Sequence, residues 1–411
     1  MNDRFFYIPE SFNADCLLNS DLVKPVHLDK VHYVLSKLYY SYMINGKDGV
    51  KWNEFINLHS KILERVLTCR KAKLVMDELV DSGILESDDL YIKGYKSYGY
   101  RYQDDYRGVF IKTPIYDGKF YGKLIEFGKE RLKNVLENHK GRYHIFKSIQ
   151  EIDYDAAAAL EFVNFNHYVK GKYIWDAYDY RRFVINETKR VNKGHFLFKT
   201  DSQGRLYTPF TSLSRDTMPF TTWKGKKLYS VDLCNSQPAL LSGEVDCPKW
   251  RQLCQQNELY SHLNAITEHQ FDLSDKNQKT EFKQKLFAEF LYCENHLEGE
   301  MAQVIKNEFP AVYNAAHQLK ENDYTTLPCR LQSTESKIII DDTATQFAES
   351  FPDSCLLSKH DCLITTEEYL EDLQNMIKTN FKNRVGFNPA VSVEDLEGNK
   401  IAVKVLINFI E

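Results

Sequence analysis

Two aspartates stand beside short apolar strands at distant points of the chain. Asp232 follows residues 228–231, and Asp361 lies in the link between residues 355–358 and 363–366, a pattern typical of a two-stranded hairpin. Magnesium prefers hard oxygen ligands, and two bound ions can activate an attacking oxygen and stabilise a leaving one during phosphoryl transfer. We therefore predict that Asp232 and Asp361 meet in space and hold two Mg²⁺ ions, with Mn²⁺ as a substitute, for nucleotidyl transfer.

A second acidic pair, Asp341 and Asp342, competes for this role. It falls in residues 332–347, which we predict to be helical, and adjacent residues of a helix point about 100° apart, so they seldom bind one ion together. A lone aspartate after a strand is also a common turn or capping residue. Spacing alone therefore leaves open whether Asp232 and Asp361 bind metal or cap turns.

The first part of the chain changes its hydrophobic period. Residues 27–87 have apolar positions at helical spacing, and residues 84–115 alternate as strands do. Several helices followed by a ribbon is the order of a winged helix-turn-helix. The ribbon interleaves six tyrosines with basic residues, among them Lys96, Arg101 and Arg107. Such a strip either binds nucleic acid or packs on the helices with its charges in water. The alternation of tyrosines and basic residues is compatible with both roles.

Residues 120–192 return to a helical pattern and end in a basic cluster: Arg181, Arg182, Lys189, Arg190 and Lys193. This cluster is a backbone-contact surface or a solvated helix face. Residues 195–207 alternate, and Gly204 allows a tight turn that places Arg205 at the head of a strand. Beyond Asp232 we predict a polar turn over 235–238. Helices are then expected over 248–326, 332–347 and 367–378, and strands over 355–358, 363–366 and 400–410.

Composition sets limits on the class of protein. With 411 residues, a hydrophobic fraction of 43% and a net charge of -5, the chain can bury a sizeable core, and any nucleic-acid surface must come from local Lys and Arg clusters. Nine cysteines without a CxxC pair predict free thiols in a reducing compartment. Since no run approaches the roughly 18 apolar residues of a membrane span, we expect a cytoplasmic protein with no membrane partner.

An ordered set of motifs carries a resemblance to a polymerase family. Its members are Asp232 to Gln237 after a strand, a lysine-bearing helix, Gln332 to Glu335, His360-Asp361, and the upstream D-x-x-G-R-x-Y at 201–207. This order resembles the palm and fingers of family A DNA polymerases and of phage-type single-subunit RNA polymerases. The closest likeness is to the compact transposon-virus polymerase group, over roughly residues 195–375.

The resemblance implies roles for individual residues near the acids. Asp232 and Asp361 look like the metal-binding acids, and the carbonyl of Leu233 adds a ligand. His360 and Gln332 resemble residues that meet the primer end in the minor groove, where acceptors are present for every base pair. Two further residues, Arg205 and Arg215, look like phosphate or template contacts; alternatively, each bridges carboxylates within the fold.

The resemblance also implies a nucleotide site on the helix at about 276–292. Lys279, Lys283 and Phe287 are similar to the basic-basic-aromatic series that faces the incoming nucleotide, and lysines there would bind triphosphate as point charges. Tyr292 falls one position later than the family's tyrosine, an offset of about 100° unless the helix is locally distorted. The alternative is an exposed lysine face over a core of Phe282, Leu286 and Phe290.

Gln237 occupies the position that governs sugar choice in these families. Family A DNA polymerases have Glu there, which crowds a ribose 2′-hydroxyl, whereas single-subunit RNA polymerases have Gly. Gln is similar in bulk to Glu but is uncharged, and it both donates and accepts hydrogen bonds. We expect a DNA-synthesising enzyme that tolerates ribonucleotides, with Gln237→Gly shifting use toward them.

The expected fold is α+β: a polymerase palm with an antiparallel sheet, inserted helical fingers, a helical thumb-like segment and an N-terminal winged-helix-like region. The expected domains are 1–118 (helical and winged-helix-like), 119–194 (thumb-like), 195–247 (first part of the palm), 248–330 (fingers) and 331–411 (second part of the palm). The expected function is DNA-templated nucleotidyl transfer by a DNA polymerase, with primase activity, of a phage or mobile element. The substrates would be a DNA template and nucleoside triphosphates, in a bacterial or phage-infected cell. The alternatives are a single-subunit RNA polymerase or primase, and a non-catalytic DNA-binding replication initiator with a relic palm.

Overall fold

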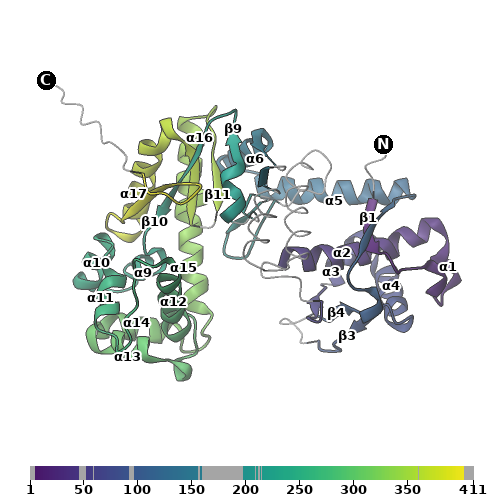
Figure 1. The fold of residues 1–411 in the computed structure, drawn as a ribbon, viewed down its shortest axis with the longest axis horizontal. Helices are drawn as coiled ribbons and strands as arrows, with labels where there is room; N and C mark the ends of the chain where they lie inside the picture. Colours follow the sequence, from purple (N-terminus) through teal and green to yellow (C-terminus); the bar gives the residue numbers. More distant parts are fainter. Residues whose placement is uncertain are drawn as a thin grey trace. The chain divides into compact units, whose positions relative to one another are not determined.

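The computed structural model describes residues 5–45, 52–58, 60–91, 97–155, 158–159, 198–208, 210–211, 213, 215–359 and 361–401. The chain forms two compact units, one of residues 1–133 and 156–196, the other of residues 134–155 and 197–411. Both combine helices with small antiparallel sheets (Figure 1). Within the described ranges, no helix has both the length and the apolar character needed to cross a bilayer.

The first unit places three helices beside a three-stranded sheet in the order β2-β4-β3. In chain order its core elements are α2 (Pro25–Asn45), β2 (Ile56–Asn57), α3 (Ser60–Leu67), α4 (Cys69–Asp81), β3 (Leu85–Ser87) and β4 (Gly99–Tyr102). Around them lie β1 (Phe5–Pro9), α1 (Ser20–Val23), β5 (Phe110–Pro114), which pairs with β1, and the start of α5 (Gly118–Leu136). As the sequence indicates, α4 ends before Ser82 and Gly83, and Gly83 has a positive φ of 67°.

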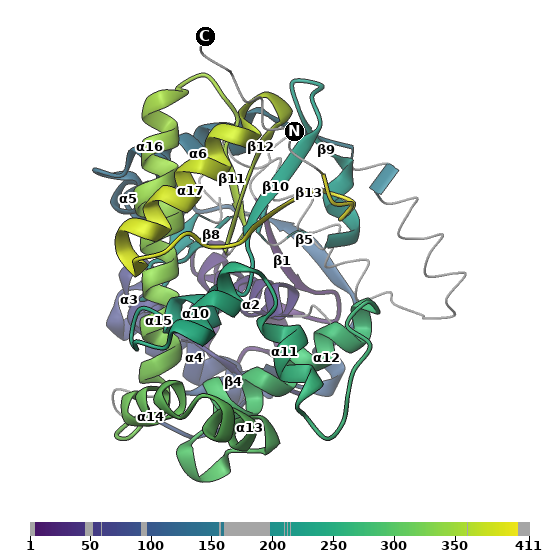
Figure 2. The ribbon, with the colours of Figure 1, turned by 90° about the vertical axis from the view of Figure 1, so that its left-hand side faces the viewer.

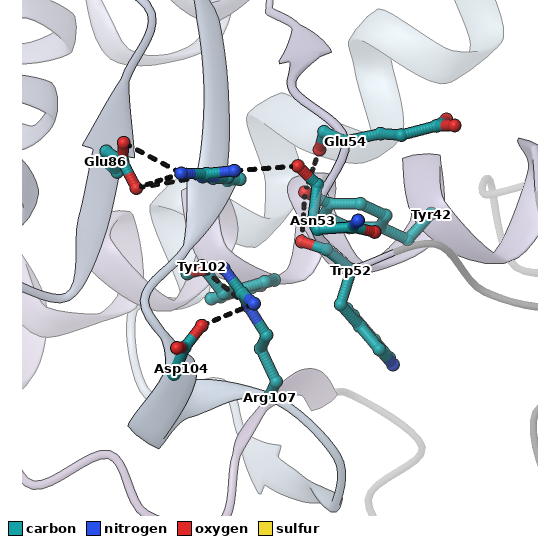
Figure 3. A network of polar contacts seen from close by, with 9 residues as sticks. Tyr42, Trp52, Asn53, Glu54, Glu86, Tyr102, Asp104 and Arg107 are labelled. Carbon is teal, nitrogen blue, oxygen red and sulfur yellow. Dashed lines mark hydrogen bonds and ion pairs between the residues drawn. The ribbon is translucent and has the colours of Figure 1, made fainter.

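A polar network ties the tyrosine-rich ribbon to the body of the first unit (Figure 3). Arg101 makes two hydrogen bonds with the Glu86 carboxylate, at 2.8 and 2.9 Å, and a third with the Asn53 carbonyl at 2.9 Å. The Arg107 guanidinium donates to the Tyr102 carbonyl at 2.8 Å and pairs with Asp104. Both arginines therefore serve packing, as one of the two interpretations of the ribbon predicts. Lys96 and the basic cluster at 181–193 lie outside the described residues.

We expect Arg101→Met to lower the free energy of unfolding of the first unit by about 1–2 kcal/mol, because it leaves the Glu86 carboxylate without its bidentate partner. Thermal unfolding measures this loss. If the ribbon is structural, the salt dependence of DNA affinity should stay unchanged in the variant. Lys24→Met, at a side chain that is 66% exposed and lies outside both α4 and the ribbon, serves as the control for loss of a positive charge. A weaker salt dependence of DNA affinity, with an unchanged free energy of unfolding, would show instead that Arg101 contacts DNA.

The second unit is built on a four-stranded antiparallel sheet in the order β11-β12-β10-β13. Its strands are β10 (Leu228–Leu233), β11 (Leu357–Lys359), β12 (Cys362–Thr366) and β13 (Val391–Asp395). The hairpin of β11 and β12 was expected, but β13 was not. It pairs with β10 on the side opposite β12, and the strand predicted at 400–410 falls in a segment described only to residue 401.

Helices cover the sheet and gather at one end of it (Figures 1 and 2). A continuous helical stretch of α15 (Thr326–Ser336), η7 (Lys337–Thr343) and α16 (Ala344–Ser350) packs on α6 (Lys140–Glu151), while α17 (Leu370–Val385) lies against β10. Between β10 and β11 the chain forms α9 (Ser236–Leu241), α10 (Pro248–Gln255), α11 (Leu259–Ala265), α12 (Lys276–Leu286), η5 (Phe287–Leu291), α13 (Glu300–Glu308) and α14 (Pro310–Leu319). The core lies where these helices meet the sheet; Val231, Leu363, Ile364 and Ile377 are fully buried there.

Short strands complete the second unit: β6 (Ile152–Tyr154) pairs with β9 (Thr221–Trp223), and β7 (Lys199–Thr200) pairs with β8 (Leu206–Tyr207). A 3-10 segment, η4 (Arg215–Phe220), precedes β9. The tight turn between β7 and β8 contains Gly204 at a φ of 83°, so Arg205 stands at the head of β8 as predicted. A Cβ at Gly204 would lie 3.5 Å from the Ser336 side chain, so this turn approaches α15 closely.

Candidate active site

The central sheet brings Asp232 and Asp361 to the same place. In the antiparallel register, Asp232 on β10 lies opposite Cys362, the first residue of β12. Asp361 directly precedes that residue, in the turn from β11. The two acids therefore stand at one end of neighbouring strands. Rigid pairing on both sides of β10 fixes the first of them.

Burial acts on both carboxyl groups, and a neighbouring negative charge adds to its effect on each of them. Burial raises the pKa of Asp232 to about 8, and the negative charge of Asp361 is the next cause. Burial also raises the pKa of Asp361 to about 6, followed by the charge of Glu335. The Oδ1 atom of Asp232 is buried and has no hydrogen-bond partner among the described residues. Such a pair is stabilised by a proton or by a cation.

The lysine face of α12 supplies positive charge toward this pair. Lys283 lowers the pKa of both Asp232 and Asp361, although less than burial raises them. Its ammonium also lies 5.4 Å from the centroid of the Tyr260 ring. Burial lowers the pKa of Lys279, and the charge of Lys283 lowers it further. Lys279 is exposed and Lys283 is partly buried.

The opposite face of this helical segment is apolar. Phe282, Leu286 and Phe290 are fully buried, as the alternative interpretation of the helix expects. The apolar core beneath the helix is therefore confirmed, while a nucleotide-binding role of the lysine face stays a prediction.

A π-helical turn places Tyr292 at the site. The segment η5 follows α12, and the Tyr292 amide donates to the Phe287 carbonyl, five residues earlier, at 2.8 Å. This turn holds one residue more than an α-helical turn, which is the local distortion that the one-residue offset of Tyr292 requires. The two rings lie 5.1 Å apart between centroids, and the Tyr292 side chain hydrogen-bonds Gln332. Tyr292, Phe287 and Gln332 thus lie together.

Glu335 on α15 is a site residue that the motif analysis missed. Its carboxylate accepts hydrogen bonds from Arg205 Nη2 at 2.6 Å, Ser236 Oγ at 2.5 Å and Gln237 Nε2 at 2.8 Å. The charge of Glu335 also raises the pKa of both Asp232 and Asp361, after the effect of burial. One signal was available in the sequence: Glu335 lies four residues after Leu331 and four before Ile339, both buried, so it occupies a core position of the helix.

The segment after Asp232 differs from the sequence prediction. Residues 235–238 were expected to form a polar turn. Only Asn235 has a turn conformation, with a φ of 52°, whereas Ser236, Gln237 and Pro238 form the first turn of α9. Pro is favoured in the first turn of a helix because its missing N–H has no partner there. As part of this helical turn, Ser236 and Gln237 reach Glu335 on α15.

The other residues predicted for the site differ in their contacts. Arg215 pairs with Glu394 at 3.2 Å, so it bridges to a carboxylate within the fold, as Arg205 does. Leu233 ends β10 with a buried side chain, and His360 lies outside the described residues. The competing acids have separate partners: Arg142 bonds Asp341 at 2.8 Å, and Arg384 bonds Asp342 at 3.0 Å. Across the part of the chain that the structure describes, no cluster of three or more His, Cys, Asp or Glu side chains is arranged to hold a metal ion.

Comparison with known proteins gives little beyond this geometry. No protein-family model matches the sequence, and no curated protein matches it. One similar solved structure is the POL domain of Pol1 from M. smegmatis in complex with a DNA primer-template and dNTP, with a TM-score of 0.39 and 12% sequence identity. The alignment covers 68% of this chain and 66% of that chain. This weak likeness assigns no role to individual residues.

Proposed function

We propose that this protein is a DNA-templated nucleotidyltransferase that extends a primer with nucleoside triphosphates. The observation that carries the proposal is the pair of aspartates at one end of neighbouring antiparallel strands, with one buried unpaired carboxylate oxygen and a lysine-bearing helix directed at them. A buried acid whose pKa is raised further by a neighbouring acid favours binding of a divalent cation over a structural ion pair. Turn capping does not explain Asp232, because this residue lies inside β10 and is paired with Cys362 and Ser392.

The donor set fits Mg²⁺ or Mn²⁺. Asp232 and Asp361 would hold the ions through carboxylate oxygens, and the unpaired Oδ1 of Asp232 is available for one of them. When bound, such ions supply the positive charge that phosphoryl transfer requires. Within the chain, Lys279 and Lys283 would bind the triphosphate as point charges. Phe287 and Tyr292 would present their rings to the nucleotide.

Different parts of the fold would have different roles around this site. In this proposal residues 195–247 and 331–411, which include the four-stranded sheet, form the palm. Residues 248–330, from α10 to the start of α15, form the fingers. In the first unit, the order α2-β2-α3-α4-β3-β4 and the sheet order β2-β4-β3 correspond to a winged helix-turn-helix. The exposed Arg70, Lys71 and Lys73 on α4 favour a DNA backbone as its partner. The proposed thumb, 119–194, lies partly outside the described residues.

Extension of a labelled primer-template, with dNTPs and rNTPs supplied separately in Mg²⁺ and in Mn²⁺, tests this function. Extension with dNTPs supports the DNA polymerase, and strict use of rNTPs would show the single-subunit RNA polymerase or primase. DNA binding without any incorporation would identify the non-catalytic replication initiator. Omitting the primer distinguishes primase activity from extension alone.

We expect Lys283→Met to lower kcat/KM for the incoming nucleotide by about 10- to 100-fold, equivalent to about 1.4–2.8 kcal/mol. The loss should appear mainly in KM, because the ammonium would act on the triphosphate in the bound state as well as in the transition state. Lys276→Met, at the exposed start of the same helix, is the control and should leave both constants unchanged. Equal effects of the two variants would contradict a nucleotide-binding role for Lys283.

A further inference from the structure

A buried carboxylate organises the polar side chains next to the two acids. Glu335 is 2% exposed, and a charge at this depth must be fully hydrogen-bonded. Arg205 Nη2 bonds one of its oxygens, while Ser236 Oγ and Gln237 Nε2 share the other. Together with Glu335, these partners come from three segments that are distant in the sequence. Glu335 therefore fixes the start of α9 relative to α15 and to the head of β8.

This contact sets the orientation of the Gln237 carboxamide. A carboxylate accepts hydrogen bonds but does not donate them, so only the NH₂ group of Gln237 can face Glu335. The carbonyl oxygen, Oε1, must then point away. Gln237 is 6% exposed, and its Oε1 is buried without a hydrogen-bond partner among the described residues. A buried acceptor in this state is stabilised by any ligand that donates a hydrogen bond to it.

The cluster adjoins the proposed catalytic pair. Gln237 follows Asp232 by five residues, across the turn that joins β10 to α9. The Glu335 charge acts on both acids, and the Arg205 charge acts on Asp361. A nucleotide whose phosphates meet the acids and the α12 lysines carries its sugar next to those phosphates. The sugar hydroxyls are therefore the donors nearest to this cluster.

We propose that Glu335 is a positioning residue that fixes Gln237 so that its Oε1 accepts a hydrogen bond from the 2′-hydroxyl of a ribonucleotide. The inference rests on the proposed function and names part of its substrate class. A site built to bond a hydroxyl disfavours the analogue that lacks it, because the buried acceptor then stays unpaired. In this proposal Gln237 promotes ribonucleotide use, whereas a gate that acts by bulk alone would oppose it. This role of Gln237 therefore reverses the sequence-based expectation that Gln237→Gly shifts use toward ribonucleotides.

Three variants separate these roles. Gln237→Met keeps the length and bulk of the side chain but removes the carbonyl acceptor. Glu335→Gln leaves one side-chain oxygen, which the Arg205 guanidinium takes, so the new NH₂ faces Gln237 and draws the Gln237 oxygen toward itself. Glu244→Gln is the matched control: it weakens a carboxylate–guanidinium pair with Arg330 on the same helix α15, where Arg330 Nε donates at 2.8 Å.

The measured quantity is kcat/KM for ATP divided by kcat/KM for dATP opposite a templating T. We expect this ratio to fall by about 3- to 10-fold in Gln237→Met and in Glu335→Gln, the range of one neutral hydrogen bond, and to stay unchanged in Glu244→Gln. The double variant should show the ratio of Gln237→Met alone, because Glu335 acts through Gln237. A merely structural role would lower both constants and leave their ratio unchanged.

Each other outcome overturns the inference in a recognisable way. If wild-type protein extends primers but the ratio is unchanged in Gln237→Met, the acceptor role is wrong and the proposed function stands. If Gln237→Met alone changes the ratio, Glu335 is not a positioning residue. If wild-type protein incorporates neither nucleotide, the proposed function fails and the inference fails with it. Should thermal unfolding show that Glu335→Gln does not fold, Glu335→Asp replaces it, since it keeps the charge opposite Arg205 and withdraws the carboxylate from the amide.

Discussion

Asp232→Asn and Asp361→Asn should each lower nucleotide incorporation by at least about a thousandfold, because each removes a charge that positions the divalent ions acting in the transition state. Asparagine has the shape of aspartate, and the carboxylates repel one another in the native protein. The fold and the DNA affinity should therefore be retained. Single-turnover incorporation in Mg²⁺, on protein whose DNA binding has been confirmed, measures the effect.

Asp342→Asn is the matched control for this loss. It replaces an acid of the second unit that Arg384 bonds at 3.0 Å and that belongs to the competing Asp341-Asp342 pair. Incorporation by this variant should remain close to that of the wild type. Near-normal turnover in either active-site variant, or loss of activity in the control, would show that the metal site does not lie at Asp232 and Asp361.

Asp232→Asn should also make the metal-free protein more stable at alkaline pH, by as much as about 5 kcal/mol. Burial, followed by the charge of Asp361, raises the folded-state pKa of Asp232 to about 8 from an ordinary value of 3.8. The folded protein then binds more protons than the unfolded chain between these values. Wild-type stability consequently falls as pH rises from about 4 to about 8. The neutral amide avoids this loss, so its advantage is absent at acid pH and complete above pH 8.

Thermal unfolding in the presence of a chelator, at intervals from pH 4.5 to pH 8.5, measures this difference. Adding Mg²⁺ at pH 8 should raise the melting temperature of the wild type more than that of the variant, because the ions bind only the native carboxylate pair. Asp353→Asn, at a side chain that is 98% exposed, should change neither curve. A constant gap between wild type and Asp232→Asn across the pH range would show that Asp232 is not strained by its surroundings.

Much of the arrangement around the acids was readable from local sequence. An apolar run before Asp232 and the hairpin flanking Asp361 predict two strands, and antiparallel pairing of β10 with β12 then brings their ends together. Gly204 predicted the turn before Arg205 because a positive φ suits glycine. Apolar spacing predicted the helices from residue 248 onward. Each of these inferences depends on neighbours within a few residues along the chain.

The features that the sequence did not reveal depend on contacts between distant segments. Glu335 meets Arg205 and Gln237 across about 130 and 98 residues, and no local pattern pairs them. The alternation of the tyrosine ribbon could not show that Arg101 would bond Glu86 rather than phosphate, because either partner suits an arginine on a strand. The strand β13 has few apolar residues, and its pairing with β10 makes it a strand.

The π-helical turn at η5 explains why motif spacing can mislead. An extra residue inside a helix would ordinarily rotate everything after it by about 100°. Here the insertion is absorbed within one turn, so Lys283 keeps its place near the acids while Tyr292 still meets Gln332. A gapless alignment scores such a tyrosine as absent, although the side chain is present in space. Insertions of this kind let an active site keep its geometry while its sequence signature diverges.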